Sequence, residues 1–115
     1  MKVVMPYIGG VLSVNDYKVR GKGGVATNKT KRVVEIWMGE LAEKVRGSGF
    51  GRNLKIELFG HFYDDRAPDL HNLHKVIGDA VKEGLVVDDK EFKFIDLGYD
   101  TGHNRPTLDI TLTRE

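Results

Sequence analysis

Polar side chains gather at the start of one predicted helix in the second half of the chain. Leu70, Leu73 and Ile77 recur at helical spacing, so we expect them to face the core. Five polar residues are then left on or beside the exposed side: Asp69, His71, Asn72, Lys75 and Asp79. Carboxylates suit a hard divalent cation such as Mg²⁺, and a nearby ammonium group can neutralise charge that develops on a phosphate in a transition state. This segment therefore carries the side chains that phosphodiester cleavage requires.

Each of these residues also has a purely structural interpretation. Asp69 follows Pro68 and can cap the N-terminus of the helix, while Lys75 can be a solvated surface charge. Further along, Asp88 and Asp89 can simply form a turn. Taken one at a time, the residues do not decide between structure and chemistry.

Charge is unevenly distributed along the chain, although the net charge is only +1. Between Tyr17 and Val34 the charged residues are all basic, namely Lys18, Arg20, Lys22, Lys29, Lys31 and Arg32. The acidic residues concentrate between Asp64 and Asp109, so we expect any metal site there. The glycine-rich part of the basic segment lacks the GK[ST] ending of a P-loop, so no nucleotide cofactor is expected.

The remaining histidines lie on different predicted elements. His61 is at a strand end, His74 in a helix and His103 in a loop, and none has a zinc-type spacing such as HExxH. We interpret each as a structural or surface residue. Because cysteine is absent, any metal must be held by oxygen or imidazole nitrogen.

Hydrophobic periodicity predicts the elements that position these residues. Alternating apolar residues indicate strands, and apolar residues at i, i+3 and i+4 indicate helices. The predicted elements are a strand over 3–14 that bends at Gly9 and Gly10, a helix over 30–46, a strand over 54–61, a helix over 69–83, and strands over 92–97 and 108–112. Trp37 falls on the apolar stripe of the first helix and is expected in the core. The order β-α-β-α-β-β predicts an α+β, or mixed α/β, domain with a mixed sheet and two helices.

Composition predicts where the protein acts. The 115 residues, of which 40% are hydrophobic, are sufficient for one folded domain over 1–115. The first residues have too short an apolar run for a signal peptide, and no apolar stretch is long enough to span a membrane. Together with the lack of cysteine, this predicts a cytoplasmic protein with no membrane partner.

One family resemblance joins these features. The segment DLHNLHKVIGDAVKEGLVVDD resembles the RusA family of Holliday junction resolvases, whose motif is DLDNLxK followed by a pair of aspartates. Upstream, Ser13, Asn15 and Tyr17 resemble the family's SxNxxY region, and a basic loop and a helix follow. The resemblance covers nearly the whole chain.

The resemblance implies a metal-dependent endodeoxyribonuclease that cuts four-way DNA junctions in recombination and repair. Asp69 then matches the first metal-binding aspartate, Lys75 the essential lysine, and Asp89 the downstream aspartate, with Asp88 as its neighbour. The expected cofactor is Mg²⁺, with Mn²⁺ possible. DNA contacts are expected from Asn15, Tyr17, Lys18, Arg20, Lys22, Lys29, Lys31, Arg32 and Asn72.

His71 stands where the family motif has its second aspartate. An imidazole in that position removes one charge and one oxygen ligand, which weakens the site for Mg²⁺ and makes it more tolerant of Mn²⁺ or another transition ion. His71 can be a metal ligand or a spectator. An alternative function is therefore binding of branched DNA without cutting, and a third is a dimeric fold with no role on DNA.

The family acts as a dimer, and two symmetric incisions in a four-way junction fit a homodimer with a two-fold axis. A helix over 69–83 is roughly 20 Å long, so Asp89 lies beyond its far end. Either the following linker folds back or a second subunit supplies this aspartate, and both arrangements stay open.

Overall fold

The computed structural model describes residues 1–13, 28–87 and 92–115, with only the backbone of 28–31. Its elements are β1 (Lys2–Pro6), η1 (Gly10–Leu12), α2 (Asn28–Val45), β2 (Leu54–His61), η2 (Leu70–Leu73), α3 (His74–Leu85), β3 (Lys93–Asp100) and β4 (Thr107–Arg114). The predicted α+β class with a mixed sheet and two helices is confirmed. No helix in the described ranges has the length and apolar character to cross a membrane.

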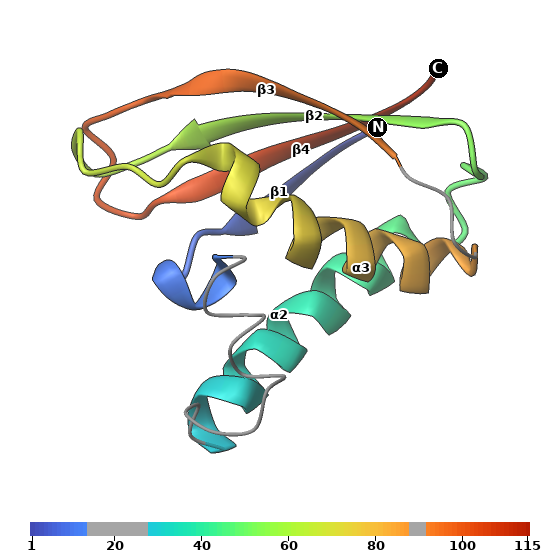
Figure 1. Cartoon of the computed structure of the whole chain (residues 1–115), viewed down its shortest axis with the longest axis horizontal. Helices are drawn as coiled ribbons and strands as arrows, with labels where there is room; N and C mark the ends of the chain where they lie inside the picture. The colour runs from blue at the N-terminus through green and yellow to red at the C-terminus, as the bar shows by residue number, and fades with distance from the viewer. Residues whose placement is uncertain (14–27, 88–91) are drawn as a thin grey trace.

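The four strands form one sheet in the order β1-β4-β2-β3. β4 runs antiparallel to both β1 and β2, whereas β2 and β3 are parallel. Both helices lie on the same side of this sheet (Figure 1). Because β2 and β3 are parallel, their carboxyl ends, at His61 and Asp100, meet at one edge.

The core fills the space between the sheet and the helices. Residues of β2 and β4 alternate between buried and half-buried, so one face of the sheet packs inward. Facing it are α2, through Val34, Trp37 and Leu41, and α3, through Ile77 and Val81. Trp37 is buried, as predicted, and its indole N–H donates to the carbonyl oxygen of Pro6 at 2.7 Å.

The first predicted strand is wrong beyond Pro6. Strand β1 ends there, and Gly10–Leu12 forms a 3₁₀ turn in which Leu12 is fully buried. Gly9 has a φ of 103°, a conformation that glycine adopts without strain and that redirects the chain. The apolar residues after the glycines therefore reach the core from a turn and not from a strand.

Strand β3 contains an irregularity that a period-two pattern does not reveal. The register shifts between Leu58 and Phe59 of β2, which pair with Asp96 and Gly98, so Leu97 is an extra residue. An extra residue in one strand reverses the alternation of side chains after it. Asp96 consequently shares the helix-covered face with buried Leu58, whereas Asp100 shares the opposite face with His61.

Candidate functional site

The chain enters α3 through a capped 3₁₀ turn. Asp69 lies before this turn, and its Oδ1 accepts a hydrogen bond of 3.0 Å from the backbone N–H of His71. Its carbonyl oxygen accepts another from the N–H of Asn72. The prediction of one continuous helix from Asp69 is therefore wrong, because Leu70–Leu73 is a 3₁₀ turn and the α-helix starts at His74.

This 3₁₀ turn brings two histidines together. Side chains at i and i+3 eclipse one another when the backbone has three residues per turn, and His71 and His74 have this separation. Their ring centroids are 4.7 Å apart in an edge-to-face arrangement. On an ideal α-helix the two side chains would be offset around the axis, so the 3₁₀ turn brings the two rings closer together.

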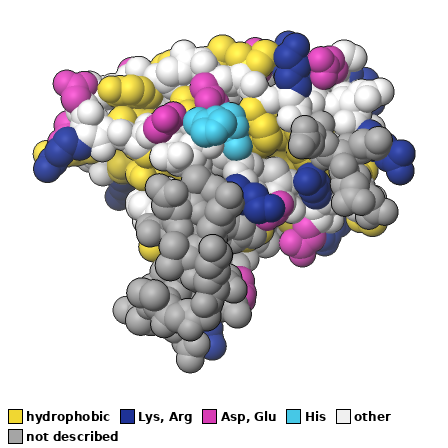
Figure 2. All heavy atoms as spheres, viewed as in Figure 1, with side chains coloured by type: hydrophobic (Ala, Val, Ile, Leu, Met, Phe, Trp, Pro, Cys, Tyr) yellow, Lys and Arg dark blue, Asp and Glu magenta, His cyan; other side chains and the backbone are white. Residues whose placement is uncertain are grey.

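Asp96 of β3 completes a group that could hold a metal ion. His74 Nε2 lies 2.8 Å from Asp96 Oδ1, and the donor atoms of His71, His74 and Asp96 all lie within 4.8 Å of one another. We call these three residues the helix-head cluster. Figure 2 shows histidine side chains at the molecular surface with acidic side chains beside them.

Strand β3 also orients the ring of His74. The rings of His74 and Phe94 stack with centroids 4.2 Å apart and an interplanar angle of 12°. Phe94 and Asp96 are two residues apart on the strand, so they point to the same face of the sheet. One strand thus supplies both a platform for the imidazole and an oxygen partner for its Nε2 atom.

Two imidazoles and one carboxylate form a donor set suited to a first-row transition ion. Lys75, the next residue along α3, is half exposed and places its Nζ atom 3.4 Å from Asp79 Oδ2. Its ammonium group is one helical turn from the carboxylate that holds it. An anion that reached the helix head could compete with Asp79 for this ammonium group.

The structure brings together only some of the predicted site residues. Asp69, His71, Asn72 and Lys75 lie at the head of α3, and Arg32 is exposed on α2. Outside the described residues lie Asn15, Tyr17, Lys18, Arg20, Lys22, Asp88 and Asp89, together with the side chains of Lys29 and Lys31. DNA binding by the basic residues and metal binding by Asp88 and Asp89 therefore stay predictions.

Two members of the helix-head cluster were not expected from the sequence. The sequence favours a structural role for His74, although its spacing of three from His71 is a usable signal where the turn is 3₁₀. Asp96 carried no signal, because it joins His74 only through the packing of β3 against α3. A family motif confined to one segment cannot indicate such a contact.

One family model matches most of this chain. The family model described as endodeoxyribonuclease RusA matches residues 13–113, which is most of the chain. A search of curated proteins gave no match. The matched range includes the helix head, the cluster and all of α2, α3, β2 and β3. The chain therefore belongs to the RusA family of endodeoxyribonucleases.

Proposed function

We propose that this protein is a metal-dependent endonuclease that resolves four-way DNA junctions in recombination and repair. The observation that carries the proposal is the helix head, where the motif residues Asp69 and Lys75 stand beside a group of potential metal ligands. Family membership supplies the class of reaction, and the cluster supplies a place for the ion. Hydrolysis would leave 5′-phosphate and 3′-hydroxyl ends, as expected for the family.

The donor set fits a divalent ion but favours some ions over others. The cluster presents imidazole nitrogen as well as carboxylate oxygen, whereas Mg²⁺ prefers oxygen ligands alone. Mn²⁺ accepts both kinds of donor more readily. We propose that Asp69, Asp88 and Asp89 add carboxylate ligands beside His71 of this cluster, and that Mn²⁺ supports the reaction at least as well as Mg²⁺.

A bound divalent ion would activate water and offset charge on the scissile phosphate. Lys75 would move from Asp79 to a phosphate oxygen, where its charge is stabilising as negative charge develops. Asp69 holds the turn that presents His71, so it has a positioning role through its Oδ1 atom as well. Asn72, next in the turn, would contact the DNA strand.

Binding of a four-way junction would use the basic segment and a second subunit. Lys18, Arg20 and Lys22 would meet backbone phosphates, with affinity that falls as salt rises. A homodimer with a two-fold axis would place two sites on the two strands that are cut. We propose that this takes place in the cytoplasm.

A second candidate function is recognition of branched DNA without cutting. The observation that favours it is His71, because an imidazole replaces the carboxylate that the family motif has at this residue. Such a protein would bind a junction with the same salt dependence and would leave both strands intact.

The test is cleavage of a synthetic four-way junction in Mg²⁺ or Mn²⁺ by the wild type and by Asp69→Asn. Asparagine caps a helix about as well as aspartate, so this variant should fold while it loses the charge. We expect a loss of cleavage of at least about a hundredfold, because the variant loses a metal-binding charge although it keeps the cap. Asp65→Asn, an exposed aspartate in the preceding loop, serves as the matched control and should cut like the wild type.

If Asp69→Asn and the wild type cut equally, the site assignment is wrong. If neither cuts but both bind the junction, the second function holds.

A further inference from the structure

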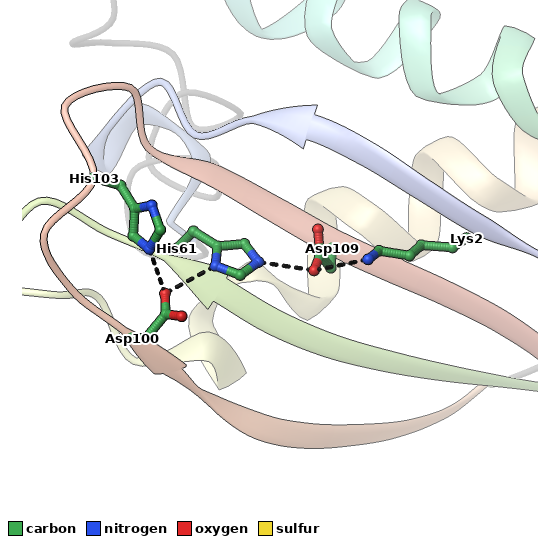
Figure 3. A network of polar contacts seen from close by, with 5 residues as sticks. All are labelled: Lys2, His61, Asp100, His103 and Asp109. Carbon is green, nitrogen blue, oxygen red and sulfur yellow. Dashed lines mark hydrogen bonds and ion pairs between the residues drawn. The ribbon is translucent and has the colours of Figure 1, made fainter.

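A polar network crosses the sheet face opposite α2 and α3 (Figure 3). Lys2 Nζ is 3.3 Å from Asp109 Oδ2, which is 2.8 Å from His61 Nε2. The other ring nitrogen, His61 Nδ1, is 2.8 Å from Asp100 Oδ1, and His103 Nε2 is 2.7 Å from the same oxygen. The network thus follows the strand order β1-β4-β2-β3 and ends in the loop after β3.

Strand geometry explains why His61 and Asp100 meet. They are register partners at the carboxyl ends of two parallel strands. Without the extra residue Leu97, Asp100 would point toward the helices, as Asp96 does. The bulge therefore sends one carboxylate to each face of the sheet, and the group around His61 is separate from the helix-head cluster.

The backbone holds His103 in place independently of its side chain. The N–H of His103 donates to the carbonyl oxygen of Phe62, and the N–H of Gly102 donates to that of Tyr63. Gly102 has a φ of 93°, which favours glycine. The loop is thus tied to the segment after β2, and the His103 ring lies 5.0 Å from the His61 ring before any ligand is added.

The number of N–H groups on the His61 ring indicates that one ring nitrogen can bind a cation. Both ring nitrogens face carboxylate oxygens, but a neutral imidazole carries only one N–H. If His61 Nε2–H donates to Asp109, then Nδ1 presents a lone pair toward Asp100 and His103. A cation there would be bound by all three, while Asp109 fixes the tautomer of His61 from behind, as outer carboxylates commonly do at metal sites.

We propose that His61, Asp100 and His103 form a second metal site, which takes Zn²⁺ or a similar transition ion and fastens the β3–β4 loop to the end of β2. The three donor atoms lie within 4.8 Å of one another. Two imidazoles and a carboxylate with an open fourth position are a common zinc donor set. Mg²⁺ and Ca²⁺, which prefer oxygen, should bind weakly.

Small movements would complete the coordination sphere. Ligands of a tetrahedral zinc ion lie about 3.3 Å apart, given bonds of about 2.0–2.1 Å, so Asp100 needs to move away from each histidine nitrogen by about half an ångström. The side chains of His61, His103 and Asp100 are 25%, 40% and 52% exposed. Solvent can therefore supply the fourth ligand, and the ion can enter directly.

The experiment is calorimetric titration of the chelator-treated full chain with Zn²⁺, together with visible absorption of the Co²⁺ form. We expect His103→Gln to lose one bound ion per chain, or to bind it at least about tenfold more weakly. Asp109→Asn should weaken the same ion about tenfold, because only the outer carboxylate changes. His74→Gln, in the helix-head cluster, is the matched histidine control and should leave this ion bound.

The proposal would be overturned if His74→Gln bound no ion at all, because every ion of the wild type would then belong to the helix-head cluster. Unchanged binding by His103→Gln would overturn it as well. His103 lies outside the helix-head cluster, so His103→Gln should keep the junction cleavage of the wild type. Because the result is read from binding alone, it does not depend on whether the protein cuts junctions.

Discussion

At the scale of single residues, we expect His71 to influence which ion binds at the N-terminal end of η2 and α3. Its backbone N–H is fixed by Asp69, and its ring packs edge-to-face on His74. The side chain is exposed, so it can be replaced without filling or emptying the core. The donor type at this residue can therefore be changed while the turn that presents it is kept.

His71→Asp should raise Mg²⁺-supported junction cleavage by at least about tenfold, because an oxygen ligand with a charge replaces an imidazole. The advantage of Mn²⁺ over Mg²⁺ should shrink in parallel. Cleavage rates measured in each ion separately check both effects. His71→Asn, which supplies an oxygen without the charge, is the control and should give a smaller gain.

Equal rates for the wild type and His71→Asp in Mg²⁺ would mean that His71 is a spectator of the reaction.

Sequence patterns could indicate only the part of this site whose residues are close together in the sequence. Asp69, His71 and Lys75 fall within one motif, so their proximity follows from seven residues of chain. The contact of His74 with Asp96 joins residues 22 apart, and that of His61 with Asp100 joins residues 39 apart. Such contacts depend on strand register and on the bulge at Leu97, neither of which a hydrophobic pattern specifies.

At the scale of elements, α2 and β2 were predicted well because their apolar periods are long and regular, whereas the second helix was predicted without its 3₁₀ start. β1 was overestimated, because Val11 and Leu12 reach the core from a 3₁₀ turn. The packing of α2 against α3 depends on a feature that no periodicity reveals. Gly84 lies so close to Ala42 and Val45 of α2 that a Cβ atom would overlap both residues.

Gly84→Ala should therefore destabilise the protein by about 2 kcal/mol, since a well-packed interface must separate to admit the methyl group. Gly39→Ala is the matched control, because a Cβ atom at Gly39 of α2 meets nothing within 4 Å. That change should be neutral or stabilise by about 0.5–1 kcal/mol. Urea unfolding of the two variants checks the difference, and equal midpoints would contradict it.

We expect the network across the four strands to make the stability of the protein depend on pH. The hydrogen bond with Asp109 raises the pKa of His61; burial opposes this, and Asp100 adds to the rise. Burial acts to raise the pKa of Asp109, but the hydrogen bonds from His61 and Lys2 outweigh it and lower that pKa. Both shifts favour the ion pair of protonated His61 with ionised Asp109.

The two shifts act at opposite ends of the pH range. Stabilisation by His61 is fully present below its unfolded pKa of 6.5 and is lost as pH rises through the higher folded value. Stabilisation by Asp109 is present above 3.8 and is lost as pH falls through its lower folded value. The network contributes most between these two limits.

Metal-free wild type should thus lose unfolding free energy as pH rises above 6.5 and through the higher folded pKa of His61. Asp109→Asn should lose less over the same range, because it removes the main cause of the raised pKa of His61. Urea unfolding with a chelator present, at several pH values, measures both slopes. Asp65→Asn should follow the wild type, and parallel curves for Asp109→Asn would refute the coupling.

At the scale of the whole molecule, the distance between Asp69 and Asp89 decides whether one chain can supply both proposed metal ligands of a site. α3 runs from His74 to Leu85, so its end is about 16 Å from its head at about 1.5 Å per residue. Asp69 lies beyond that head, before η2. The N–H of Val87 still donates to the carbonyl oxygen of Lys82 at the end of α3, and two further residues extend at most about 7 Å, which is less than the length of the helix.

A partner subunit is therefore the expected source of Asp89, and complementation between inactive variants tests this. In a heterodimer of Asp69→Asn with Asp89→Asn, shared sites would place both changes in one site and leave the other intact. Such a heterodimer should nick one strand of a four-way junction, although each homodimer is inactive. If Asp89 acted within its own chain, both sites would carry a change, and no nick would form. Differently tagged subunits, co-purified and assayed on a junction labelled on each strand in turn, distinguish the two arrangements.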